Sequence, residues 1–210
     1  MSTALDNQDL HFGYSGRSTS CGVSLRVDSG DCYGFLGHNG AGKTTVMRLA
    51  LGLLQPSRGR VSVFGADARL RRREANGLIG ALIERPGFHL HLSARHNLRA
   101  LARLQGIARP AASAEVERVI EAVGLTTAID RRVGTFSMGM RQRLGIAQAM
   151  LGQPRLLLLD EPTNGLDPEG IAELRALLQH LTREQGVAVL LSSHQLAELC
   201  LLYTSDAADE

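Results

Sequence analysis

Glycines, a lysine and a threonine stand at residues 37–44 in a spacing that can hold a phosphate group. The sequence Gly-His-Asn-Gly-Ala-Gly-Lys-Thr fits the pattern G-x-x-x-x-G-K-[ST]. The glycines let the backbone curl so that successive N–H groups point inward, and the next helix begins with unpaired amides facing the same place. Lys43 would reach the β- and γ-phosphates of a nucleotide, and the Thr44 hydroxyl would ligate Mg²⁺. The alternative is a glycine-rich turn that caps a helix and binds nothing.

Two carboxylates follow a run of four leucines at residues 156–159. Such a run is typical of a central parallel strand buried on both faces, and ligands of open α/β sheets lie beyond the carboxyl ends of the strands. We expect Asp160 to hold Mg²⁺, directly or through water, and Glu161 to act on the attacking water as a general base. Two carboxylates that cap the following turn are the alternative.

Two ring side chains at the ends of predicted elements are weaker candidates. His194 follows an apolar strand and could hydrogen-bond the γ-phosphate or the attacking water, although a lone histidine in such a place is more often a surface residue. Tyr14 lies in the first turn and could stack on an adenine, or it could be an ordinary exposed turn residue.

These residues require alternating strands and helices to position them. Apolar runs between turn residues predict strands at residues 5–12, 22–27, 32–36, 60–65, 78–83, 156–161 and 187–191. Helices are expected at residues 45–54, 69–76 and 168–184. Residues 88–149 carry only helical patterns, at 93–104, 114–123 and 141–150, with Ser93 as an N-cap. We interpret this block as a helical subdomain inserted between strands of an α/β core.

The composition limits the classes of protein that fit. The chain has 210 residues, of which 44% are hydrophobic and 21% charged, which are values of a globular protein. Its net charge of +2 is too small to suggest nucleic-acid binding. No apolar run approaches the roughly 20 residues of a membrane span. The three cysteines lack metal-ligand spacing, and their odd number argues against a disulfide framework.

Residues 136–143, Phe-Ser-Met-Gly-Met-Arg-Gln-Arg, resemble the signature motif of ATP-binding-cassette (ABC) ATPases. Residues 164–167, Asn-Gly-Leu-Asp, resemble the D-loop of that family, His194 its switch histidine and Tyr14 its adenine-stacking aromatic residue. The resemblance covers residues 10–198 in the order of the family. It implies a P-loop NTPase core with a parallel sheet, an N-terminal antiparallel β subdomain and an inserted helical subdomain.

The resemblance also implies cofactors and partners. Two cassettes, expected to be identical, would pair head to tail around two ATP molecules with Mg²⁺, so that Ser137 and Gly139 of one face the γ-phosphate held by Lys43 of the other. Catalysis would depend on Lys43, Glu161 and His194. The nucleotide-binding positions would be Tyr14, Gly37, His38, Asn39, Gly40, Ala41, Gly42, Lys43, Thr44, Thr45, Ser137, Gly139 and Asp167.

Three positions depart from the common family pattern. Met138 and Met140 replace a glycine and a glutamine of the signature, and Glu84 replaces a glutamine. A carboxylate near the γ-phosphate would be repelled unless Mg²⁺ or another cation neutralises it. We therefore place Glu84 with Thr44 and Asp160 at the metal site, with its coordination left open. A glutamate there is usual in one subgroup, the ATP-binding subunits of bacterial bacitracin and lantibiotic exporters. Residues 83–88, 136–148 and 165–170 also resemble that subgroup.

The family reading predicts the motor of an exporter for an antimicrobial peptide, drug or similar compound. It would lie peripherally on the cytoplasmic face of the bacterial inner membrane and dock on a separate transmembrane permease subunit. A soluble ABC ATPase that acts on the ribosome or nucleic acid is the alternative. Against it, the interval from Lys43 to Ser137 contains no heptad repeat.

The expected organisation is one ABC ATPase domain at residues 1–199 and an unrelated tail at 200–210. Within the domain, residues 1–84 and 151–199 would form the core and residues 85–150 the helical subdomain. The tail resembles a translated sequencing adapter, so the chain would be a truncated piece of its gene and could be inactive. Truncation would leave an unpaired sheet edge beside residues 187–191.

Overall fold

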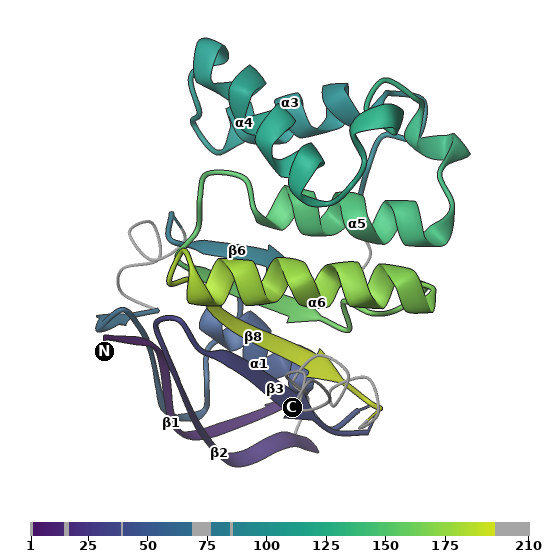
Figure 1. The fold of residues 1–210 in the computed structure, drawn as a ribbon. Coiled ribbons are helices and arrows are strands. Elements are labelled where there is room, and N and C mark those ends of the chain that lie inside the picture. The colour runs from purple at the N-terminus through teal and green to yellow at the C-terminus, as the bar shows by residue number, and fades with distance from the viewer. Residues whose placement is uncertain (1, 15–16, 39, 69–76, 85, 196–210) are drawn as a thin grey trace, which may run out of the picture.

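A computed structural model describes residues 2–14, 17–38, 40–68, 77–84 and 86–195. Two four-stranded sheets lie next to a group of helices that extends away from the parallel sheet (Figure 1). One sheet has the strand order β2-β1-β4-β5 and the other the order β3-β8-β7-β6. The predicted tail and the predicted helix at 69–76 lie outside the described residues.

The first sheet is antiparallel throughout. It contains β1 (Thr3–Tyr14), β2 (Arg17–Asp28), β4 (Arg58–Val63) and β5 (Ala66–Asp67). The first two strands are longer than predicted because they pair with each other well beyond their apolar stretches, through several register shifts. The two residues of β5 are too few to produce a pattern that sequence reasoning could detect.

The second sheet is parallel and contains β3 (Cys32–Leu36), β8 (Ala188–Ser193), β7 (Leu156–Asp160) and β6 (Ile79–Leu82). The expectation of a free edge beside residues 187–191 is wrong. Strand β8 is paired on both sides, with β3 and with β7, because the strand order in space differs from the order in sequence. All four predicted core strands are present.

One face of the parallel sheet packs on the antiparallel sheet with helix α1 (Lys43–Ala50) between them. Leu156 and Leu158 of β7 are fully buried in this first core, together with Met47 of α1 and Leu5 of β1. Alternate residues of a strand point to opposite faces of its sheet. Leu157 and Leu159 therefore enter a second core on the other face.

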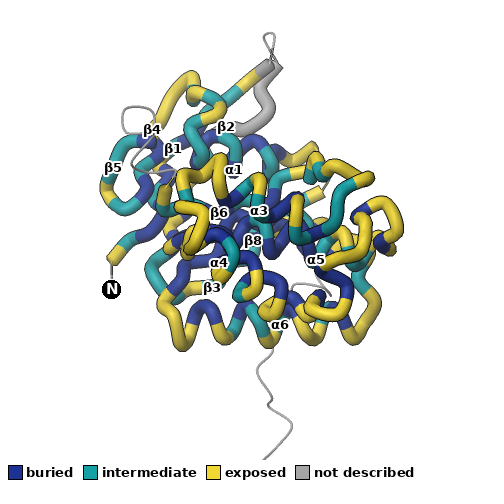
Figure 2. Tube along the Cα trace, turned by 90° about the horizontal axis from the view of Figure 1, so that it is seen from above, coloured by how far each residue is buried: buried dark blue, intermediate teal, exposed yellow. Residues whose placement is uncertain are grey.

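The second core is covered by helices. It is formed under α3 (Ala94–Leu104), α4 (Arg109–Ala122), α5 (Met138–Ala149) and α6 (Pro168–Arg183). Helix α5 lies directly on β6, and Gly80 makes this possible, since a Cβ atom there would lie 1.8 Å from the carbonyl oxygen of Ala149. Figure 2 shows the buried strands in the centre, with exposed residues on the outer turns of α6.

Four helix boundaries differ from the predictions by more than one residue. Helix α1 begins at Lys43, two residues before the predicted start, and ends at Ala50, where Leu51 caps it, so the predicted last turn is absent. Helix α4 begins at Arg109, since a proline is compatible with the first turn of a helix. Helix α5 begins at Met138, directly after its N-cap Ser137.

The predicted N-cap Ser93 is confirmed, because its side chain accepts a hydrogen bond from the backbone N–H of His96. In the described part of the chain, no helix is both long and apolar enough to cross a membrane.

Candidate functional site

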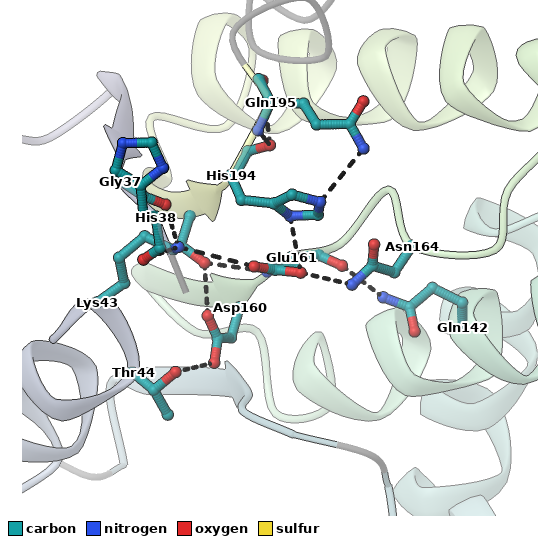
Figure 3. Close-up of polar contacts among 12 residues, drawn as sticks. Gly37, His38, Lys43, Thr44, Gln142, Asp160, Glu161, Asn164, His194 and Gln195 are labelled. Carbon is teal, nitrogen blue, oxygen red and sulfur yellow. Dashed lines mark hydrogen bonds and ion pairs between the residues drawn. The ribbon is translucent and has the colours of Figure 1, made fainter. Parts of the chain in front are cut away.

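The site lies where the parallel strands end. Asp160 is in register with Ser192, and Leu36 with Ser193, so the segments that follow β3, β7 and β8 meet at one edge of the sheet (Figure 3). A cavity of about 850 Å³ opens there. Lys43 and Thr44, Asp160 and Glu161 line it, together with Glu84, which follows β6. The structure thus brings five of the six predicted catalytic and metal-site residues to one cavity, whose lining does not include the sixth, His194.

The loop before α1 ends at a glycine in the left-handed region of backbone conformation. Gly42, the N-cap of α1, has a φ of 90°, which residues with a side chain rarely adopt, and it provides no side-chain cap. Lys43 is 5% exposed and folds back on the loop. Its Nζ donates to the carbonyl oxygens of Gly37 at 2.5 Å and His38 at 3.3 Å. A buried ammonium group and free helix-N-terminal amides together suit a polyphosphate.

Thr44 and Asp160 form a pair of oxygen ligands. The Thr44 hydroxyl donates to Oδ2 of Asp160 at 2.6 Å, and the fully buried Ser192 hydroxyl donates to Oδ1 at 2.5 Å. Among the described residues, no three His, Cys, Asp or Glu side chains gather as a metal-binding cluster. Proteins hold Mg²⁺ through one or two oxygen-bearing side chains while water and substrate phosphates complete the octahedron, and the Thr44–Asp160 pair could supply two such oxygens.

Glu161 lies one residue beyond β7 at the centre of a polar network. Its φ is 49°, in the left-handed region that is unusual for a residue with a Cβ atom. Oε1 lies 3.7 Å from Nζ of Lys43, and Oε2 lies 3.1 Å from Nδ1 of His194 and accepts from Nδ2 of Asn164 at 2.7 Å. Ser192 accepts from the Glu161 backbone N–H at 3.1 Å. These contacts hold the carboxylate toward Lys43 (Figure 3).

Glu84 follows β6 and also has a positive φ, 64°. Its side chain is 64% exposed and forms an ion pair with Arg48 of α1, which is 31% exposed. The sequence analysis left open which cation neutralises this carboxylate. In this structure it is the guanidinium group of Arg48.

The signature residues lie at the start of α5. Ser137 is exposed, and its hydroxyl accepts the backbone N–H of Met140 at 3.1 Å. Met138 is 61% exposed and also lines the cavity. Its side chain packs against Gly165 of the D-loop segment, where a Cβ atom would lie 2.4 Å from the Met138 methyl group. The unusual methionine thus joins two of the motifs within one chain.

Some predicted residues lie apart from this network or outside the description. Asp167 caps α6, where its Oδ1 accepts the backbone N–H of Gly170 at 3.0 Å. Tyr14 is the last residue of β1, but its side chain is outside the described part of the structure, as is Asn39. Gly40 and Thr45 line the cavity with their neighbours in the loop.

Sequence reasoning missed Arg48 and Ser192. It placed Gln142 and Asn164 in the signature and D-loop motifs but assigned neither of them a contact in the site. Gln142 donates to the backbone carbonyls of Glu161 and Pro162 at 3.2 and 3.1 Å, which ties α5 to the turn after β7. Asn164 is three residues from Glu161, a spacing that a turn brings together. The contact of Ser192 depends on the strand register, and no local pattern reveals it.

The protein-family model described as ABC transporter matches residues 21–164. The chain belongs to the ABC transporter family. The predicted family and its α/β fold class are therefore confirmed. Among relatives of this ABC protein, a bacitracin transport ATP-binding protein of Bacillus licheniformis is 45% identical over 199 residues, which are 95% of the chain and 64% of that protein. The chain therefore spans less than two thirds of the length of that relative.

Another relative of the ABC protein and two solved structures also carry names of ATP-binding proteins or ABC transporter parts. A lantibiotic transport ATP-binding protein of Streptococcus pyogenes is 36% identical over 192 residues, 91% of the chain and 80% of that protein. Among solved structures, cbiO1 of Clostridium perfringens, part of an ABC transporter complex, superposes with a TM-score of 0.84 at 26% identity, over 96% of this chain and 82% of that one. An ATP-binding cassette in its ADP conformation superposes with a TM-score of 0.83 at 21% identity, over 96% of this chain and 85% of that one, and supports the fold alone.

Proposed function

We propose that this ABC protein binds and hydrolyses ATP, and that hydrolysis powers the export of an antimicrobial peptide, drug or similar compound through a separate transmembrane permease subunit. The observation that supports it most is the convergence of Lys43, Asp160 and Glu161, from segments far apart in the chain, on one cavity. In this proposal the protein works on the cytoplasmic face of the membrane and reaches it through the permease.

ATP phosphates would take over the contacts that Lys43 now makes with its own loop. The Lys43 ammonium group would leave the carbonyls of Gly37 and His38, both in hydrogen-bond contact with it, and turn to the β- and γ-phosphates. The backbone amides of residues 37–45 would bind the remaining phosphate oxygens. The side chain of Tyr14 would stack on the adenine.

The oxygen atoms of Thr44 and Asp160 would hold Mg²⁺, whose charge, when it is bound, offsets that of the phosphates. Glu161 would accept a proton from the water that attacks the γ-phosphorus, while the bond to the β-phosphate oxygen breaks and ADP leaves. A general base of this kind contributes roughly 10²- to 10⁴-fold. His194, 3.1 Å from Glu161, would orient that carboxylate and the water.

A second cassette, identical in the simplest case, would complete the site. Ser137 and Gly139 stand at the N-terminal end of α5, where helix amides favour an anion. In a head-to-tail pair they would contact the γ-phosphate held by Lys43 of the other copy, and Asp167 would lie at the junction. The exposure of Ser137 is compatible with this role.

We assign the parts of the chain in the same proposal. Residues 1–84 and 151–199 would act as the nucleotide-binding core, and residues 85–150 as the helical subdomain that faces the permease. Residues 200–210 would play no part. The printed names of the bacitracin and lantibiotic relatives support export of an antimicrobial compound over other transported substrates.

The nucleotide step is tested with Lys43→Ala. Its ATP affinity, measured by titration calorimetry with Mg²⁺, should fall at least about 100-fold, since a buried charge-assisted contact to phosphate is lost. Arg183→Ala, which removes an exposed cation at the far end of α6, is the matched control and should bind ATP like the wild type. Unchanged affinity of Lys43→Ala would contradict the proposed phosphate site.

The transport step is tested in a bacitracin-sensitive bacterium. Co-expression with its proposed transmembrane permease should raise resistance, and Glu161→Gln should abolish that gain while leaving the amount of protein unchanged. Co-purification with ribosomes in place of the permease would instead favour the soluble ABC ATPase. Nucleotide binding without any effect on resistance would leave the ATPase and overturn the exporter.

A further inference from the structure

The ion pair between Glu84 and Arg48 joins two segments of the nucleotide site that are 36 residues apart in sequence. Glu84 begins the segment that leads from β6 to α3, and Arg48 belongs to the last turn of α1, the helix that follows the phosphate loop. Glu84 lines the same cavity as Thr44 and Asp160. The carboxylate thus lies at the edge of the site where Mg²⁺ would bind.

Arg48 is placed by the geometry of α1. It is four residues after Thr44, and residues at this spacing lie on the same face of a helix, about one turn or ~6 Å apart along the axis. The face of α1 that carries the metal ligand Thr44 therefore also carries the cation that pairs with Glu84. Glu84 pairs with Arg48 and lines the same cavity as Thr44.

We propose that Arg48 is a positioning residue for Glu84. In the nucleotide-free protein it neutralises this carboxylate and holds it against α1, and the pair opens when Mg²⁺ and ATP occupy the site. This rests on the proposed function. A neutral side chain at position 84 would need no such partner, because it would not repel the γ-phosphate.

Because both side chains of the Glu84–Arg48 pair contact solvent, another cation can replace Arg48 as the partner of Glu84. Glu84 is 64% and Arg48 31% exposed, and ion pairs in contact with solvent are weak. A divalent cation bound to a triphosphate can therefore compete with the guanidinium group for Glu84. A fully buried pair would be far harder to open.

Opening of the Glu84–Arg48 pair would affect the helical layer, because the segment after Glu84 contacts it through hydrogen bonds and packing. The backbone N–H of His89 donates to Asn97 of α3 at 2.8 Å, and the Leu90 carbonyl accepts the backbone N–H of Gly134 at 2.8 Å. Pro86 lies against Gly145 of α5, where a Cβ atom would be 2.8 Å from its ring. The state of Glu84 would thus reach the helix that Ser137 caps.

A double-mutant cycle on the full chain tests the proposal through binding. The variants are Arg48→Ala, Glu84→Gln and the two together, and ATP affinity is measured by calorimetry with Mg²⁺ and with EDTA. Arg48→Ala alone should weaken metal-free ATP binding by roughly threefold to tenfold, because Glu84 is left without its cation. In the Glu84→Gln background the same change should have less than a twofold effect. Added Mg²⁺ should recover most of the loss in Arg48→Ala.

Two further variants separate positioning from other roles. Arg48→Lys keeps the charge and should bind metal-free ATP within about twofold of the wild type, provided that its thermal unfolding curve is native. Arg183→Ala is the control for net charge and should change nothing. An equal loss for Arg48→Ala in the wild-type and Glu84→Gln backgrounds would mean that Arg48 contacts phosphate or supports the fold, and would overturn the proposal. If the wild type itself does not bind ATP, the proposed function fails, and this inference with it.

Discussion

Two glutamates follow neighbouring strands of the parallel sheet, but their side chains differ in exposure and in contacts. Strands β6 and β7 are paired in register, and Glu84 and Glu161 each come just after the end of one of them, with φ values of 64° and 49°. The backbone therefore presents two carboxylates at one edge of the sheet in a similar way. Glu84 is 64% exposed and Glu161 only 22%.

The difference lies in the surrounding side chains. Glu161 is contacted by the buried Lys43, by His194 and by Asn164, which between them hold both of its oxygens. Glu84 pairs with the partly exposed Arg48. A carboxylate held in place beside a buried lysine suits the proposed general base. A more exposed carboxylate paired with an arginine suits the proposed replacement of that arginine by another cation. The role of a strand-end acid is thus set by its neighbours more than by its backbone.

The largest expected effect is on the rate of ATP hydrolysis, which should distinguish Glu161 from Glu84. Glu161→Gln should lower the ATP hydrolysis rate about 10²- to 10⁴-fold, because the positioned base is lost. It should still bind ATP and accumulate as an ATP-held dimer, visible by size-exclusion chromatography. Glu84→Gln should lower the rate less than about tenfold, since no proton transfer depends on it. Phosphate release measures both, and equal losses would break the comparison.

A medium effect, on the free energy of unfolding, is expected at Ser192. Its hydroxyl contacts the end of β7, next to Glu161, and not the end of β6, next to Glu84. Ser192→Ala removes a buried hydroxyl that donates to Asp160 and accepts from the Glu161 backbone. The free energy of unfolding should fall by about 1–3 kcal/mol. Urea titration measures it, with Ser29→Ala, whose hydroxyl hydrogen bond is exposed, as the control. If Ser192→Ala lowers the free energy of unfolding no more than Ser29→Ala does, the end of β7 beside Glu161 is held no more firmly than the end of β6 beside Glu84.

The smallest effect is expected at Glu115 of α4, a carboxylate away from both strand ends that serves as a reference. Hydrogen bonds from Arg118 hold the pKa of Glu115 below its ordinary value of 4.5, against the effect of burial. Because the folded-state pKa is lowered, the stabilisation is present above about pH 4.5 and is lost as the pH falls through the folded-state pKa. Glu115→Gln should cost about 1–2 kcal/mol at pH 7.

Unfolding by urea at pH 7 and at pH 3.5 checks this. The gap between the wild type and Glu115→Gln should narrow at the lower pH. A constant gap would mean that the contacts of Glu115 act through shape and not through charge. Neither pH should change the rank order of the Ser192 and Ser29 variants.

The sequence allowed the residues that gather at the cavity to be predicted better than the residues that support them. Lys43, Thr44, Asp160 and Glu161 stand in local patterns, a glycine-rich loop and an apolar run, whose physical meaning does not depend on the rest of the fold. The pairing of Arg48 with Glu84 could not be found in this way, because it depends on how α1 lies against the end of β6. The same applies to Ser192, whose contact follows from strand register.

Strand order was the other limit of prediction. Residues 187–191 were expected beside an unpaired edge because truncation would remove a further strand, whereas β8 is paired on both sides, with β3 and with β7. The helical block was predicted from its lack of strand patterns and is present. Its helices start earlier than predicted where Pro110 and Ser137 allow a first turn that sequence propensity disfavours.

Strand β7 has a consequence for how distant parts of the molecule influence chemistry. Its four leucines enter two separate hydrophobic cores alternately, and the carboxylates of Asp160 and Glu161 lie at the end of this strand. A substitution that loosens the antiparallel sheet and one that loosens the helical layer should therefore both disturb the same two oxygen-bearing side chains. A random search for variants with altered hydrolysis should recover positions on both sides of the strand, many of them far from any bound nucleotide.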